Sequence, residues 1–194
     1  MMTQYPTLQY AEAKFANVSD IPVIDLKTDG VIDEVETIAT LLIEAASETG
    51  FFYVSGHGVP VELCNQAMRA SRSFFELPES TKTAIAINQH QRGWMRQGLS
   101  NLEGSATHDA KEVFFWGRDV DPNDPQAEKS LPLVHPNQWP DRDAPFLRTE
   151  ITPYYESIMA LGLRILKYLA IGLDVDPIIF EEAYQKPLGR GQLV

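Results

Sequence analysis

The sequence predicts an α+β fold in which helices outnumber strands, and two kinds of apolar spacing support this. Apolar residues recur every three or four positions over 31–45 and again over 147–172, which is the period of one helical face. Short runs of β-branched and aromatic residues bounded by glycine or proline, such as 111–116, are typical of strands. With 44% hydrophobic residues and no internal repeat, the chain should form one ordinary core.

The first elements are a strand, a helix and a second strand. The run Ile21–Leu26 carries Pro22 near its start, as an edge strand tolerates. Gly50 should end the following helix as a C-cap, and Phe51–Ser55 should form a short buried strand before His57. The predicted apolar face of the helix is Val31, Val35, Ile38, Leu42 and Ala45.

The next elements are two helices and a strand. Val59–Pro60 opens a helix that Leu77–Pro78 ends, and a short helix begins at Pro78. The predicted apolar face of the first of these helices is Leu63, Ala67, Ala70 or Ser71, and Phe74. Weak periodicity and repeated glycines from 83 to 104 predict loops with short extended pieces. In the strand 111–116, the period of two places Val113 and Phe115 on one face and Glu112, Phe114 and Trp116 on the other.

A proline-rich and acidic segment, 118–143, is predicted to be a long surface connection. It could link two domains, but its apolar anchors favour one body: Leu131, Leu133, Val134 and Trp139. A long core helix should span 144–172, with Ile158 on its apolar face and a kink or a new start at Pro153. The expected organisation is an arm over 1–20, one domain over 21–188 and a further strand over 189–194.

Charge and composition exclude several classes of protein. The net charge of −11 and a pI near 4.7 disfavour nucleic-acid binding, which depends on clustered Lys and Arg. The single Cys64 cannot form an internal disulfide, and neither a secretory leader nor an apolar run near twenty residues is present. We therefore predict a cytoplasmic protein without a membrane segment.

Six short motifs follow one another in a characteristic order: Ile21–Leu26, Gly50–Val59, Phe74–Pro78 with Lys82 after it, Arg92–Trp94, Asp109–Phe114 and Pro136–Pro140. In this order they resemble the N-terminal region of the isopenicillin N synthase-like family of non-haem iron, 2-oxoglutarate-dependent oxygenases. The resemblance covers 21–194. It implies a helix-rich N-terminal module with a few strands that flanks a double-stranded β-helix (jelly-roll) core. That core would start at 189–194 and is otherwise absent.

The resemblance implies Fe(II) and 2-oxoglutarate as cofactors of the parent enzyme, with iron held by two histidines and a carboxylate that begin as His-x-Asp. None of the four histidines, His57, His90, His108 and His135, has an acid two positions later. We therefore predict no metal ligand, no catalytic residue and no bound cofactor in this chain, and no activity from it alone.

Three weaker candidates receive structural interpretations. His108–Asp109 could be a base with its orienting acid, but adjacent side chains seldom point the same way. Arg69–Ser71 matches the Arg-x-Ser pattern with which the family holds 2-oxoglutarate, yet it lies on an early helix and should be solvated. Gly189–Gly191 is too short for a phosphate-binding loop, and His57 should be structural.

The resemblance places function on the substrate side. In the family, the loop and strand that match 92–95 and 113–115 cover one mouth of the barrel. The predicted substrate-binding residues are therefore Arg92, Met95, Val113 and Phe115. Arg92 would meet an anionic substrate group or lie at the surface, and plain core packing is the alternative for Val113 and Phe115.

Two functions are compatible with these observations. In the first, the parent protein hydroxylates or desaturates a small molecule with decarboxylation of 2-oxoglutarate, and the C-terminal β-helix core of the same protein is this chain's partner. In the second, the chain is a non-catalytic binding or assembly module or the relic of a split gene. An exposed apolar face would then need another protein or self-association to cover it.

Overall fold

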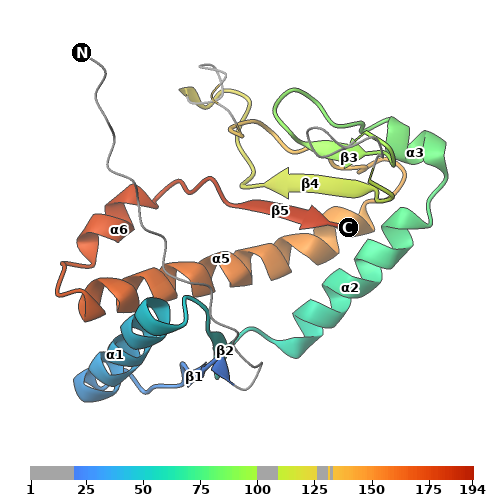
Figure 1. Cartoon of the computed structure of the whole chain (residues 1–194). Coiled ribbons are helices and arrows are strands. Elements are labelled where there is room, and N and C mark those ends of the chain that lie inside the picture. Colours follow the sequence, from blue (N-terminus) through green and yellow to red (C-terminus); the bar gives the residue numbers. More distant parts are fainter. Residues whose placement is uncertain (1–19, 100–108, 126–130, 132) are drawn as a thin grey trace, which may run out of the picture. The chain divides into compact units, whose positions relative to one another are not determined.

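The computed structural model describes residues 20–99, 109–125, 131 and 133–194, and it divides into two compact units (Figure 1). One unit ends at His57 and the other begins at Gly58. The sequence placed a possible boundary in 118–143 and favoured one domain over 21–188. The division instead falls in the turn 56–58, where Gly56 and Gly58 both have positive φ, a conformation that glycine adopts without steric cost.

The first unit is a β-α-β arrangement, as predicted. Strand β1 (Val23–Asp25) pairs in parallel with β2 (Tyr53–Ser55), and helix α1 (Ile32–Glu48) connects them. The buried side of α1 consists of Ile38, Ala39, Leu42 and Ala45. Gly50 follows the helix with φ of 76°, which confirms its predicted place at the C-terminal turn.

A strand does form within the predicted range 51–55, but the prediction that it is buried is wrong. The strand begins at Tyr53, and the side chains of Phe51 and Tyr53 are 72% and 55% exposed. Residues two positions apart in an extended chain point to the same side, so Phe51 and Tyr53 share one side. Their exposure shows that no other element of the described chain covers that side. Val31, predicted on the apolar face of α1, is also exposed because it stands at the helix N-cap.

The second unit contains a three-stranded antiparallel sheet with β4 in the middle, between β3 and β5 (Figure 1). The strands are β3 (Gly93–Met95), β4 (Val113–Gly117) and β5 (Arg190–Leu193). Helices α2 (Val61–Phe75) and α5 (Phe146–Gly172) pack against each other. The short helices α3 (Glu79–Thr83) and α6 (Ile178–Ala183) complete the unit.

The core of the second unit lies between one face of this sheet and the two long helices. Trp94, Phe114 and Trp116 supply the sheet's side chains to it. The helices contribute Ala67, Ala70 and Phe74 from α2 and Leu147 and Ile151 from α5. These α2 residues are those that the four-and-three spacing predicted, so helical periodicity located this face correctly.

Helix α5 differs from its prediction in two ways. It runs unbroken through Pro153, which removes one backbone hydrogen bond without starting a new helix. Ile158, predicted in the core, is 38% exposed. A helix of 27 residues is about 40 Å long, more than twice the length of a five-residue strand, so the sheet alone cannot cover all of it.

The connection between β4 and α5 is better packed than its composition suggests. Val120, Val134 and Trp139 are buried, whereas Leu131 is 41% exposed. Two of the four predicted anchors, Val134 and Trp139, therefore hold the described part of this segment against the second unit. None of the described helices, α5 included, has the length and apolar character that a membrane crossing requires.

Candidate substrate-facing surface

The two faces of the three-stranded sheet have different surroundings. Phe114 and Trp116 of β4 point toward α2 and α5, so Val113, Phe115 and Gly117 point the other way. We call the side that points away from α2 and α5 the distal face. Strand register adds residues from both neighbours, since Met95 pairs with Val113, Gln192 with Phe115 and Arg190 with Gly117. The alternation predicted for Val113 and Phe115 is thus observed.

The predicted residue Arg92 also lies on this side of the sheet, but it is buried rather than exposed at the surface. Its side chain is 1% exposed, and a Cβ added to Gly117 would lie 2.5 Å from its Nη2 atom. The same Nη2 donates a 2.5 Å hydrogen bond to the carbonyl of Leu133. The guanidinium therefore occupies the space that a side chain at 117 would fill, and burial lowers the pKa of Arg92.

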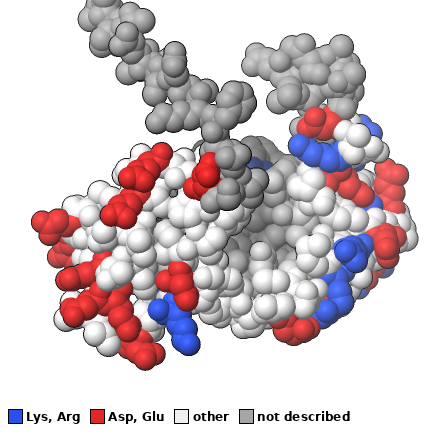
Figure 2. Space-filling view, turned by 60° about the horizontal axis from the view of Figure 1, so that its bottom comes forward, with Lys and Arg blue, Asp and Glu red and all other residues white. Residues whose placement is uncertain are grey.

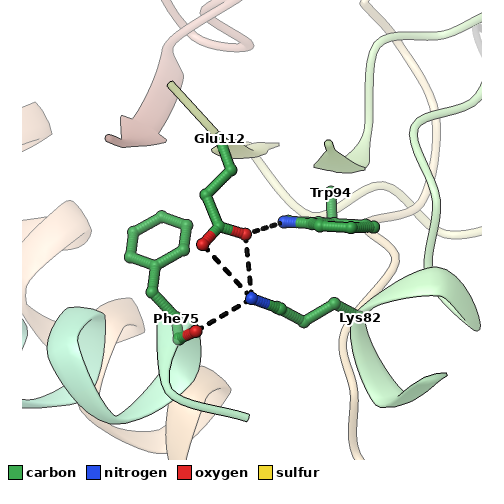
Figure 3. Close-up of polar contacts among 4 residues, drawn as sticks. All are labelled: Phe75, Lys82, Trp94 and Glu112. Carbon is green, nitrogen blue, oxygen red and sulfur yellow. Dashed lines mark hydrogen bonds and ion pairs between the residues drawn. The ribbon is translucent and has the colours of Figure 1, made fainter. Parts of the chain in front are cut away.

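A buried ion pair fixes the edge of the sheet where β3 and β4 meet (Figure 3). The Lys82 ammonium donates to both carboxylate oxygens of Glu112, at 2.9 and 3.2 Å, and to the carbonyl of Phe75 at 2.8 Å. The indole Nε1 of Trp94 donates to the same carboxylate at 2.6 Å. We call Lys82, Glu112 and Trp94 the clamp; it joins the end of α2, α3 and β3 to the start of β4.

The side chain of Lys82 is 9% exposed, and its ammonium has three acceptors within 3.2 Å, one for each N–H, as a buried polar group requires. The clamp lies in a mostly polar depression of about 510 Å³ whose other charged residues are Glu79 and Arg96. The sequence analysis noted Lys82 only as part of a motif. Thirty residues separate it from Glu112, so no local pattern could pair them.

Two amides from the long connection brace the same sheet. Asn137 receives a hydrogen bond from the N–H of Gly117 and donates to its carbonyl, both at 2.9 Å. Gln138 donates from Nε2 to the carbonyls of Ala86 and Arg92, at 2.9 and 2.5 Å. The clamp therefore fixes the start of β4, and Asn137 fixes its end at Gly117.

Arg190 and Gln192 belong to the distal face and were not among the predicted site residues. The Arg190 guanidinium lies 3.9 Å from the centroid of the Phe115 ring, a cation–π arrangement. Partial burial lowers the pKa of Arg190. The sequence analysis used Arg190 only to reject a phosphate loop. The period of two along 190–193 assigns Arg190 and Gln192 to one side of their strand. The register that sets Arg190 beside Phe115 joins segments about seventy-five residues apart, so the sequence could not reveal this contact.

The described residues do not form an iron site. No group of three or more His, Cys, Asp or Glu within the described ranges could hold a metal ion. His90 and His135 stack with parallel rings 4.0 Å apart, an arrangement in which the ring nitrogens do not converge on one point. His57 is half-buried beside Gly58, and His108 lies outside the described residues. The residues present therefore do not fit the triad that the family resemblance implies.

The remaining weak candidates have ordinary surroundings in the described part of the chain. Arg69 is 60% exposed and pairs with Glu62 at 2.8 Å, so the helical Arg-x-Ser match lies on a solvated face, as expected. Asp109 pairs with Lys111 at 3.0 Å. Acidic side chains are more widespread than basic ones over the face in Figure 2, in keeping with the net charge of −11.

Comparisons with known proteins agree with this architecture. Residues 21–142 match the family model described as "non-haem dioxygenase in morphine synthesis N-terminal". A 2-oxoglutarate-dependent dioxygenase, thnC of Trichoderma harzianum, is 28% identical over 90% of this chain and 54% of its own length. Another, caaD of Aspergillus niger, is 31% identical over 84% of this chain and 51% of its own length.

A solved structure extends the likeness to the fold. A 2OG-Fe(II) oxygenase family protein from Caulobacter crescentus superposes with a TM-score of 0.70 at 22% identity, covering 83% of this chain and 51% of that one. The chain thus spans about half the length of the relatives it matches.

Proposed function

Because the chain belongs to the non-haem dioxygenase N-terminal family, we propose that it is the N-terminal part of an enzyme that oxidises a small molecule with Fe(II) and 2-oxoglutarate. Two relatives described as 2-oxoglutarate-dependent dioxygenases support this, and each is about twice as long as the part that aligns. The other half would supply the double-stranded β-helix core and the iron ligands, with 190–193 as its first strand. The reaction would be a hydroxylation or a desaturation.

The part of this chain in that reaction would be to form one wall of the substrate pocket. The observation that carries this proposal is the two-sidedness of β4: Phe114 and Trp116 pack against the helices, whereas Val113 and Phe115 point away from them and are 1% and 8% exposed. Met95 and Phe115 would contact the substrate, and Val113 would support them from beneath. Arg92 would support this wall from beside Gly117, because its guanidinium is buried and hydrogen-bonded to Leu133.

The clamp and the two bracing amides suit this role. A pocket wall must keep its side chains in fixed positions if it is to orient a substrate for reaction. The clamp and Gln138 hold β3, and Asn137 holds the end of β4. We propose that these polar contacts fix Met95 and Phe115 relative to the rest of the enzyme.

The test is to express the product of the complete reading frame beside the 194-residue chain and to measure Fe(II) binding and conversion of 2-oxoglutarate to succinate. We expect iron-dependent succinate formation from the longer protein, and neither stoichiometric iron nor turnover from the 194-residue chain. A reading frame that stops at Val194 would favour the assembly module or split-gene relic. Iron binding with turnover by the short chain would contradict the interpretation of its histidines.

A cytoplasmic location is a separate prediction. It rests on the lone Cys64, which has no second cysteine in these 194 residues with which to form a disulfide. Fractionation of cells that produce the full-length protein from its own reading frame would test it, and recovery from a secreted or membrane fraction would contradict it.

A further inference from the structure

Arg190 is a cation on the distal face without an acidic partner in the described part of the chain. Its side chain is exposed, and its interaction there is with the ring of Phe115, 3.9 Å from the guanidinium. The described ion pairs use other residues, and no carboxylate acts on its titration. An arginine donates up to five hydrogen bonds, so this group has unused capacity for an anion.

The surroundings of Arg190 add to the positive charge. Arg92 lies next to Gly117, the residue that pairs with Arg190 across the strands. Besides burial, the positive charges of Arg190 and Arg118 lower the pKa of the Arg92 guanidinium, and the carboxylate of Asp119 raises it. Asp119 also accepts from the backbone N–H and Nδ2 of Asn137, at 3.4 and 3.3 Å. A chain of net charge −11 therefore places arginines together at this end of β4.

The neighbours of Arg190 on the same face are apolar. Phe115 and Val113 follow along β4, and Met95 faces Val113 from β3. A molecule that lay along this face would meet the exposed guanidinium of Arg190 at one end and the half-buried Met95 at the other, over Phe115 and Val113, which are 8% and 1% exposed. The planar fork of a guanidinium matches the two oxygens of a carboxylate.

We propose that Arg190 binds a carboxylate of the substrate, and that Met95 and the edge of the Phe115 ring contact the substrate's apolar body, with Val113 packed beneath them. This inference rests on the proposed function, because it assigns the distal face to the substrate pocket. It names the substrate class as a small apolar carboxylic acid. Arg190 is then a specificity-determining residue contributed by the last strand of this chain.

The experiment uses the iron-loaded protein from the complete reading frame and a panel of apolar carboxylic acids, each with its uncharged primary amide. The panel includes 3-phenylpropanoate and decanoate. Dissociation constants are measured by calorimetry for the wild type, Arg190→Gln, Arg190→Lys and the matched control Arg69→Gln. Arg69 is an exposed arginine of the same unit on helix α2, away from the distal face.

For at least one skeleton, we expect the wild type and Arg69→Gln to bind the acid about tenfold or more tightly than the amide, as a charge-assisted hydrogen bond allows. Arg190→Gln should bring this ratio to about one, and Arg190→Lys should leave it in between. An unchanged ratio in Arg190→Gln would overturn the proposal, and so would a wild type that binds no acid better than its amide.

A second readout separates this inference from the proposed function. Iron-dependent succinate formation is measured in the same preparations, with and without each acid and amide. Turnover that neutral molecules alone stimulate would support an oxygenase while overturning the role of Arg190. Absence of iron-dependent turnover from every preparation would contradict the proposed function itself, whereas the acid-to-amide binding ratio would still decide whether Arg190 binds carboxylates.

Discussion

Phe114 and Phe115 are adjacent residues of the same type on β4, and they belong to different parts of the molecule. Phe114 is fully buried between the sheet and the helices, with the rings of Phe74, Trp116 and Trp139 within 6.1 Å of its centroid. Phe115 points to the distal face, where the guanidinium of Arg190 lies 3.9 Å from the centroid of its ring. One side of the sheet packs against the chain's own helices, and on the other the buried Phe115 lies beneath an exposed cation.

Under the proposed function, this difference assigns stability to one side of a single strand and substrate recognition to the other. The helix-facing side is aromatic and aliphatic throughout, which is what a core requires. The distal face mixes Met95, Val113 and Phe115 with Arg190 and Gln192, a composition closer to that of ligand pockets, which are apolar with a few placed polar groups. Substitutions on the two faces should therefore have different consequences.

The largest effect should come from the helix-facing side. We expect Phe114→Ala to lower the free energy of unfolding by about 3–5 kcal/mol, because it leaves a cavity among three aromatic rings. Phe115→Ala should cost less, about 2–3 kcal/mol, because Phe115 is buried at 8% exposed but lies outside the aromatic cluster and is covered by the exposed side chain of Arg190. All three tryptophans lie in the cluster around Phe114, so urea unfolding followed by fluorescence reports on it. Equal losses would remove the distinction between the faces.

Next in size is the loss of the clamp, which fixes the strands that carry both faces. Lys82→Met should lower the free energy of unfolding by about 2–3 kcal/mol, because it leaves the Glu112 carboxylate without its cation. A double-mutant cycle with Glu112→Gln should show that the two losses are not additive. The matched control is Arg148→Met, which removes an exposed pair with Asp141. Full additivity of the clamp substitutions would show that the pair does not act as one unit.

A smaller effect distinguishes the two faces on β5. A Cβ at Gly191 would clash with the indole of Trp116, so Gly191→Ala should cost about 1–3 kcal/mol. Its neighbour Gln192 is exposed on the distal face, and Gln192→Ala should change stability by less than about 0.5 kcal/mol. Thermal unfolding of the two variants checks this pair, and a greater loss from Gln192→Ala would reverse the assignment of faces.

The smallest effect concerns pH and the stacked histidines beside the sheet. Burial, His135 and Arg92 lower the pKa of His90. The folded protein therefore binds fewer protons than the unfolded chain below about pH 6.5, and its stability should fall as the pH decreases from there to the folded pKa. His90→Gln should flatten this part of a plot of melting temperature against pH. An unchanged slope would show that His90 does not contribute to it.

Local patterns predicted the elements and the two sides of β4. The spacing of Ala67, Ala70 and Phe74 located the buried face of α2, and the alternation over 111–116 separated Phe114 from Phe115. Both succeed because the period of a helix or strand is itself the geometry that assigns faces. Phe51 shows the limit, because a strand-forming composition does not reveal which side of a strand is covered.

Pairings between distant segments could not be predicted from the sequence. The contact between Lys82 and Glu112, the burial of Arg92 against Gly117 and the position of Arg190 over Phe115 depend on how strands align across long connections. Register is set by the whole sheet and its turns rather than by any one segment. The alternation of Val113 and Phe115 was therefore predictable from the sequence, the position of Arg190 beside them was not, and their role in a site stays a prediction.

The most direct test of the two-face account compares Phe114→Leu with Phe115→Leu in the iron-loaded, full-length protein. For each variant, the melting temperature and the kcat and KM of the best small-molecule substrate are measured on folded protein. The account predicts that Phe114→Leu lowers the melting temperature and leaves KM near the wild-type value, whereas Phe115→Leu raises KM severalfold with a smaller change in melting temperature. A raised KM in Phe114→Leu together with wild-type kinetics in Phe115→Leu would contradict it.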